Sequence, residues 1–102
     1  MFSIIVVTQN NLPVVKEVIE HIIESTDMPA ELIVVDSAST DKTESYLRKT
    51  VATFNPRHDG INHMLVHVLD HDSIIDSIAW GLDKAGSSYV YVHIIREPKE
   101  TE

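Results

Sequence analysis

The sequence contains no cysteine, only three glycines, and half as many basic as acidic residues. Without cysteine, the chain has no disulfide, no thiolate nucleophile and no cysteine zinc site. Three glycines leave no glycine-rich loop for a phosphate group. The opening MFSIIVVTQNN is apolar for only a few residues and has no basic lead, so it is neither a signal peptide nor a membrane span. We therefore expect a cytoplasmic protein.

The charge balance limits the partners. Sixteen acidic residues against eight Lys and Arg give a net charge of −8. Such a surface repels phosphate backbones and anionic lipids, so we expect neither a nucleic-acid nor a membrane partner. The 102 residues, 43% of them hydrophobic, suffice for one domain with its own core. We predict a single domain over residues 1–102.

Short apolar runs rich in β-branched residues alternate with amphipathic stretches. We expect strands at residues 2–7, 31–36, 61–70 and 87–95. One helix should start at an asparagine cap with Pro13 in its first turn, and a second should cover about 41–52. Asp41 and Glu44 are expected to form a capping box, and Gly86 is expected to close a third helix.

This order predicts a three-layer α/β fold, with helices on both faces of a parallel, Rossmann-like sheet. The expected strand order is 3-2-1-4, which puts the third and fourth strands at the edges. Ligands of such sheets bind at the carboxyl ends of the strands, where the strand order reverses. The segments expected there are Val7–Asn10, Asp36–Ser39, Asp70–Asp72 and Ile94–Arg96.

Three stretches, FSIIVVTQN, ELIVVDSASTDKT and AWGLDKAGSSYVYV, resemble the N-terminal half of family-2 inverting glycosyltransferases. The most specific part is VVDSASTDKT, which is similar to VVDDGSTDGT of that family. Those enzymes have the GT-A fold and use nucleotide-diphosphate sugars. The resemblance implies a truncated GT-A domain that binds a nucleotide or a nucleotide-diphosphate sugar.

The resemblance also implies a nucleotide site, with departures from the family pattern. The expected nucleotide-binding residues are Thr8, Gln9, Asn10, Asp36, Ser37 and Arg96. Gln9 stands where the family has an aromatic ring, and Ser37 replaces an acid that commonly contacts the uracil base. Asp36 has two roles open to it: contact with a ribose hydroxyl or base N–H, or capping of the loop that follows.

Other parts of the transferase pattern are absent. The metal-binding Asp-x-Asp would fall on Ile94–Arg96, and the half that supplies the base and the acceptor site is not in this sequence. We therefore predict no catalytic residue, no metal site at the fourth strand and no cofactor. Arg96, helped by Lys42, is either a substitute for the metal or simply solvated. The alternative function is a non-catalytic interaction or regulatory module.

Asp70 and Asp72 form a literal Asp-x-Asp after the third strand. They are either oxygen ligands for Mg²⁺ or Mn²⁺, or charges that favour the start of the next helix, which Ser73 also suits as a cap. His63, His67 and His71 recur every four residues, too far apart along a strand for one ion. They indicate an exposed face of an edge strand.

The fourth strand is almost without charge from Tyr89 to Ile95. An unguarded apolar edge favours pairing with another chain. We expect a homodimer or larger oligomer through this strand or the adjacent helices, with a contribution from Trp80. The alternative is that the polar segment from Arg96 onward folds back over the edge. Tyr46, like Trp80, is otherwise expected in the core or an interface.

Overall fold

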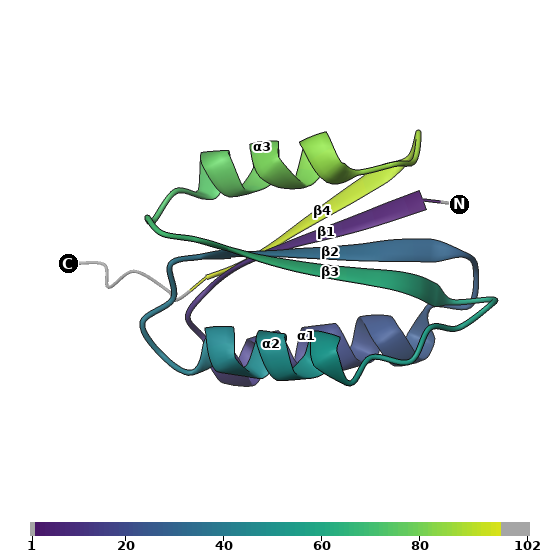
Figure 1. Cartoon of the computed structure of the whole chain (residues 1–102), viewed down its shortest axis with the longest axis horizontal. Helices are drawn as coiled ribbons and strands as arrows, with labels where there is room; N and C mark the ends of the chain where they lie inside the picture. Colours follow the sequence, from purple (N-terminus) through teal and green to yellow (C-terminus); the bar gives the residue numbers. More distant parts are fainter. Residues whose placement is uncertain (1, 97–102) are drawn as a thin grey trace.

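The computed structural model describes residues 2–96 and contains four strands and three helices (Figure 1). The elements are β1 Phe2–Gln9, α1 Leu12–Ser25, β2 Ala30–Ser37, α2 Thr43–Ala52, β3 Ile61–Leu69, α3 Ile74–Lys84 and β4 Val90–Arg96. All strands run parallel in the order β3-β2-β1-β4. The predicted α/β class and strand order are confirmed. The polar segment after Arg96 lies outside the described residues.

The sheet separates two cores. Figure 1 shows α1 and α2 on one face and α3 on the other. Along β1, Val6 packs with the α1/α2 core, whereas Ile5 and Val7 pack with the α3 core. All three side chains are fully buried, because a central parallel strand is covered on both faces.

α3 approaches the sheet closely at Gly81. A Cβ atom there would lie 2.7 Å from Cγ2 of Ile5 on β1. The absence of a side chain therefore lets the helix backbone settle onto the strand. None of the helices in the described part of the chain is both long and apolar enough to cross a bilayer.

Two expected helix ends differ in the structure. α2 begins two residues later than predicted, and Asp41 accepts from the Thr43 amide at 2.9 Å, so no capping box with Glu44 forms. α3 ends at Lys84, its C-cap Ala85 has an extended conformation, and Gly86 does not have positive φ. The Gly86 amide instead donates to Glu31 at 2.7 Å. Gly86 therefore bonds to β2 through its backbone amide and does not form a left-handed C-cap.

The other two helix starts follow the sequence more closely. Asn11 is the N-cap of α1 and Pro13 lies in the first turn, but the Asn11 side chain makes no capping bond. Ser73 caps α3, and its hydroxyl oxygen accepts from the Asp76 amide at 3.1 Å.

Candidate functional site

Most of the predicted site residues lie together at the carboxyl end of the sheet, where β1, β2 and β4 end. Thr8 on β1 is in register with Asp36 on β2, and Gln9 is in register with Arg96 on β4. Ser37 is aligned with Leu69 at the end of β3. The strand order reverses between β1 and β4, so Gln9 and Arg96 border the switch point.

The Asp36 carboxylate is enclosed by hydrogen bonds from the protein. Its Oδ1 accepts from the Thr8 hydroxyl at 2.7 Å and from the Ser39 hydroxyl at 2.6 Å. Its Oδ2 accepts from the Ser39 amide at 3.0 Å. Thr8 and Asp36 are both fully buried. The structure thus shows Asp36 in the loop-capping role, closing the turn that follows β2.

Asn10 joins the loop after β1 to the loop after β2. Its backbone amide donates to the Ser39 hydroxyl at 2.8 Å. Its side-chain oxygen accepts from the Thr40 amide at 2.7 Å and from the Asp41 amide at 3.2 Å. Asn10 and Asn11 both have positive φ, a conformation that asparagine tolerates better than most residues. The bonds of Asn10 span about thirty residues, and no local pattern predicts them.

Asp41 adds negative charge to the same loop. Partial burial raises the pKa of its carboxyl group, but hydrogen bonds from Thr43 and from the Leu12 amide outweigh that effect, so the pKa lies below its ordinary value. Asp41 is therefore ionised at neutral pH. An anionic ligand here needs a cation beside it.

Ser37 links β2 to the start of α3. Its hydroxyl oxygen accepts from the Ser73 amide at 2.8 Å, and the hydroxyl lies 3.5 Å from Asp72 Oδ1, to which it donates. The Ser37 side chain is fully buried. The residue thus holds the β3–α3 loop in place, a role that the resemblance did not suggest.

His71 connects the two acids on either side of the loop after β3. Its Nδ1 lies 2.8 Å from Asp70 and its Nε2 lies 2.8 Å from Asp76. Hydrogen bonds to Asp70 and Asp76 raise the pKa of His71, and the bonds to His71 lower the pKa of both carboxyl groups. Among residues 2–96, no three His, Cys, Asp or Glu side chains converge as metal ligands.

The three histidines do not form one exposed strand face, so that prediction is wrong. His67 is half-buried, and its ring stacks on Trp80 of α3 with centroids 4.0 Å apart and planes 2° apart. His71 lies beyond the end of β3, and His63 alone is an exposed strand residue. Trp80 packs against the sheet, and Tyr46 packs against the α1/α2 core.

The two candidate cations stand apart in the topology. Arg96 ends β4, next to β1, whereas Lys42 precedes α2 on the β2 side. Both side chains are exposed. Only Arg96 borders the switch point.

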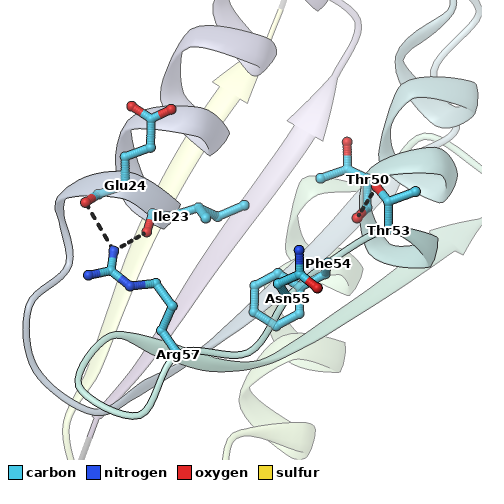
Figure 2. A pocket seen from close by; sticks show the side chains of 7 residues that line it. All are labelled: Ile23, Glu24, Thr50, Thr53, Phe54, Asn55 and Arg57. Carbon is cyan, nitrogen blue, oxygen red and sulfur yellow. Dashed lines mark hydrogen bonds between the residues drawn. The ribbon is translucent and has the colours of Figure 1, made fainter.

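Four surface hollows of about 370 to 440 Å³ lie elsewhere on the described chain. Figure 2 shows one of them, beside the last turns of α1 and α2. Arg57 borders it and donates to the carbonyl oxygens of Ile23 at 3.3 Å and Glu24 at 3.2 Å. None of these four hollows is lined by Thr8, Asp36 or Ser37. No motif in the sequence indicated a role for Arg57, which ties a loop to the end of α1.

A family model described as Glycosyl transferase family 2 matches residues 3–93. The match covers the three strand-helix units except for Phe2, the first residue of β1, and reaches the middle of β4. No curated protein and no solved structure matches the chain.

Proposed function

The chain belongs to glycosyl transferase family 2, and from this premise we propose that it binds a nucleotide or a nucleotide-diphosphate sugar at the carboxyl end of its sheet. The observation that carries the proposal is the position of the linked loops after β1 and β2. The loop after β1 borders the place where the strand order reverses, between β1 and β4, and open α/β sheets bind their ligands at such a place.

We assign the predicted residues two kinds of role. Gln9 and Arg96 lie side by side at the switch point, at the carboxyl ends of β1 and β4, and neither is buried. The Arg96 guanidinium suits a diphosphate, because it keeps its charge and donates two parallel bonds. Asn10, the neighbour of Gln9, ties the loop after β1 to the loop after β2.

Thr8, Asp36 and Ser37 are buried at the carboxyl ends of β1 and β2, next to the switch point. A direct bond from Asp36 to a ribose requires the Ser39 loop to move, since the carboxylate is fully buried and Ser39 bonds to both of its oxygens. Asp36→Ala is expected to weaken nucleotide binding more than tenfold, about 1.4 kcal/mol. Ser39→Ala separates the two roles. It weakens binding if Asp36 acts by framing the loop, and it strengthens binding or leaves it unchanged if Asp36 contacts the ligand.

We propose that the described residues bind the donor but do not carry out sugar transfer by themselves. A transferase neutralises the leaving diphosphate and supplies a base to the acceptor. We assign no catalytic residue, metal site or cofactor to residues 2–96. Transfer would therefore depend on groups from another polypeptide segment.

An NMR titration of the whole chain with UDP, GDP and their sugars tests the proposal. The Gln9, Asn10 and Arg96 amides should shift in a saturable way. Arg96→Gln should weaken binding more than tenfold, and the matched Lys42→Gln should change it less than threefold. Absence of any shift with all of these ligands would overturn nucleotide binding.

The second candidate function is a non-catalytic interaction module. The hydrogen bonds of Asp36 favour it, because a fully buried carboxylate that already accepts three bonds from the protein is shielded from a ligand. The same titration distinguishes the two: a folded chain that binds no nucleotide favours the module.

A further inference from the structure

The outer side of α3 carries an apolar stripe, which we call the α3 stripe and which consists of Ile75, Ala79 and Leu82. Ile75 and Leu82 are 80% and 50% exposed, and Ala79 between them is also exposed. Their spacing of four and three residues places all three within about 60° of one another around the helix. No other helix among residues 2–96 lies on this face of the sheet, as Figure 1 shows.

Packing of α3 on the sheet does not involve the α3 stripe. The inward side of α3 consists of buried Ser77 and Gly81, with Ile74, Ile78 and Trp80 packed against the α3 core. A single exposed apolar residue is ordinary on a protein surface. A line of them along one side of a helix is instead a pattern by which helices recognise each other. α3 therefore has two apolar sides, and only the inward side is covered by residues 2–96.

Aspartates border the α3 stripe on one side. Asp83 and Asp76 fall within the next about 60° around the helix. Their side chains are 76% and 60% exposed. Lys84 Nζ lies 3.6 Å from Asp83, and this exposed ion pair is weak. His71 Nε2 lies 2.8 Å from Asp76. Because residues 70–84 contain four aspartates against one lysine and one histidine, the border stays acidic even when the histidine is protonated.

We propose that the α3 stripe binds a basic amphipathic helix of another protein. The apolar residues of that helix pack on Ile75 and Leu82, as the side chains of two helices interdigitate where they touch. Its Lys or Arg residues lie along one flank, beside Asp76 and Asp83. The long apolar stems of these residues cover Ala79, while their charged ends reach the carboxylates. The apolar contact supplies affinity, and the charges set the orientation of the partner and its association rate.

Charge argues against other occupants of the α3 stripe. In a symmetric, antiparallel pair of α3 helices, Asp76 of one copy would lie near Asp83 of the other, and these like charges would repel. An anionic bilayer or a nucleic acid would meet the same carboxylates and a net charge of −8. A basic helix is the partner that uses both the apolar and the acidic part of this surface. The α3 stripe shares no residue with the proposed nucleotide site, so either proposal can fail without the other.

An NMR titration of the whole chain with two synthetic helical peptides tests the proposal. The lysine probe has leucines at alternating spacings of three and four residues and lysines along one flank, and the glutamate probe has glutamates in place of those lysines. The Ile75, Ala79 and Leu82 amides should shift with the lysine probe, with a Kd of about 100 µM or lower at low salt. The glutamate probe should bind more than tenfold more weakly. No shift along α3 with the lysine probe, or equal binding of the two probes, would overturn the proposal.

Ile75→Ser and Val14→Ser form a matched pair of variants. Both residues are exposed apolar residues in the first turns of helices, but Val14 belongs to α1 on the opposite face of the sheet. Ile75→Ser should raise the Kd of the lysine probe more than tenfold, and Val14→Ser should change it less than threefold. Equal effects of the two would overturn the assignment of the α3 stripe. Circular dichroism confirms that each variant is folded.

The acidic border has its own test. Asp76→Asn/Asp83→Asn should weaken binding of the lysine probe and reduce the dependence of its Kd on salt, since salt screens exposed charges. An unchanged salt dependence would contradict the role of the two aspartates and overturn the choice of a basic partner.

Two further measurements distinguish the proposed partner from a second copy and from a lipid surface. Ile75→Ser should leave the sedimenting mass of the protein unchanged, and a dimer that dissociates in this variant would overturn the proposal in favour of self-association. Vesicles of phosphatidylcholine should not bind the protein. Vesicle binding that Ile75→Ser abolishes would overturn the proposal in favour of a lipid surface.

Discussion

Thr8 on β1 and Asp36 on β2 are register partners on the two central strands, and the Thr8 hydroxyl donates to the Asp36 carboxylate at 2.7 Å. Both side chains are fully buried. A buried carboxylate is costly unless it is hydrogen-bonded, so the pair has a structural purpose before any ligand is considered. The bond holds the two loops that follow β1 and β2 at a set distance.

Thr8→Val should destabilise the fold by about 1.5–3 kcal/mol, because it keeps the branched shape and removes a donor to a buried charge. Urea unfolding followed by circular dichroism measures the change. Thr40→Val is the matched control. Its side chain is exposed, so the expected change stays within about 0.5 kcal/mol. Equal effects from both would contradict the role given to the Thr8–Asp36 bond.

The His71 bridge should make stability depend on pH. The raised pKa of His71 adds stability that is complete below its ordinary value of 6.5 and disappears as pH rises through the raised value. The lowered pKa values of Asp70 and Asp76 add stability above 3.8 that disappears as pH falls through the lowered values. The melting temperature of the protein should therefore exceed that of His71→Asn most clearly between these two limits. A pH-independent difference would contradict the bridge.

Gly81→Ala should destabilise the protein by about 1–3 kcal/mol through overpacking, although alanine favours helices by about 1 kcal/mol. The added methyl would meet Ile5 Cγ2 at 2.7 Å, inside the α3 core. Leu82→Ala is the control on the same helix, since Leu82 is 50% exposed and a smaller loss is expected. A stabilised Gly81→Ala variant would show that α3 does not need this close approach.

The contribution of Glu31 to stability should depend on Ser3. Oε2 of Glu31 accepts hydrogen bonds from the buried Ser3 hydroxyl and from the Gly86 amide. Glu31→Ala leaves the Ser3 hydroxyl without that partner, and we expect a loss of about 1–3 kcal/mol. In the Ser3→Ala background, Glu31→Ala should cost less. Additive effects in this double-mutant cycle would argue against coupling.

Metal dependence gives a separate test of the loop after β3. With Ile94 and Arg96 at the end of β4, we expect no divalent-ion site there. If calorimetry detects Mn²⁺ binding, it should disappear in Asp70→Asn/Asp72→Asn and persist in Asp83→Asn, a control on the far part of α3. Loss of binding on changing Arg96 alone would contradict this prediction.

The fold was predictable because its signals are redundant. Four β-branched runs and three apolar stripes each indicate an element, and the connection rules leave few topologies. Helix ends were less predictable, since a single side-chain hydrogen bond can change the residue at which a helix starts or ends. Asp41 satisfies the Thr43 amide instead of the Glu44 amide, and this single choice moves the start of α2.

The candidate site was predictable only in location. The carboxyl ends of parallel strands meet at one end of the sheet, and the structure has Thr8, Asp36 and Arg96 at that end. This relationship says nothing of how side chains cross between loops. The Ser39 bonds to Asp36 and the stacking of His67 on Trp80 depend on three-dimensional packing, so no spacing along the chain indicates them.

The strand order also has a consequence for how the chain folds. β1 lies in the middle of the sheet, with Thr8 paired to Asp36 and Ser3 paired to Val90. The first pairing closes a loop of moderate length, whereas the second joins residues much farther apart in the sequence, at a greater entropic cost. Such distant contacts slow folding. β4 should therefore join the sheet last and leave it first. During part of the folding time of a newly made chain, the edges of β1 and β4 that later pair with each other should be open to other molecules.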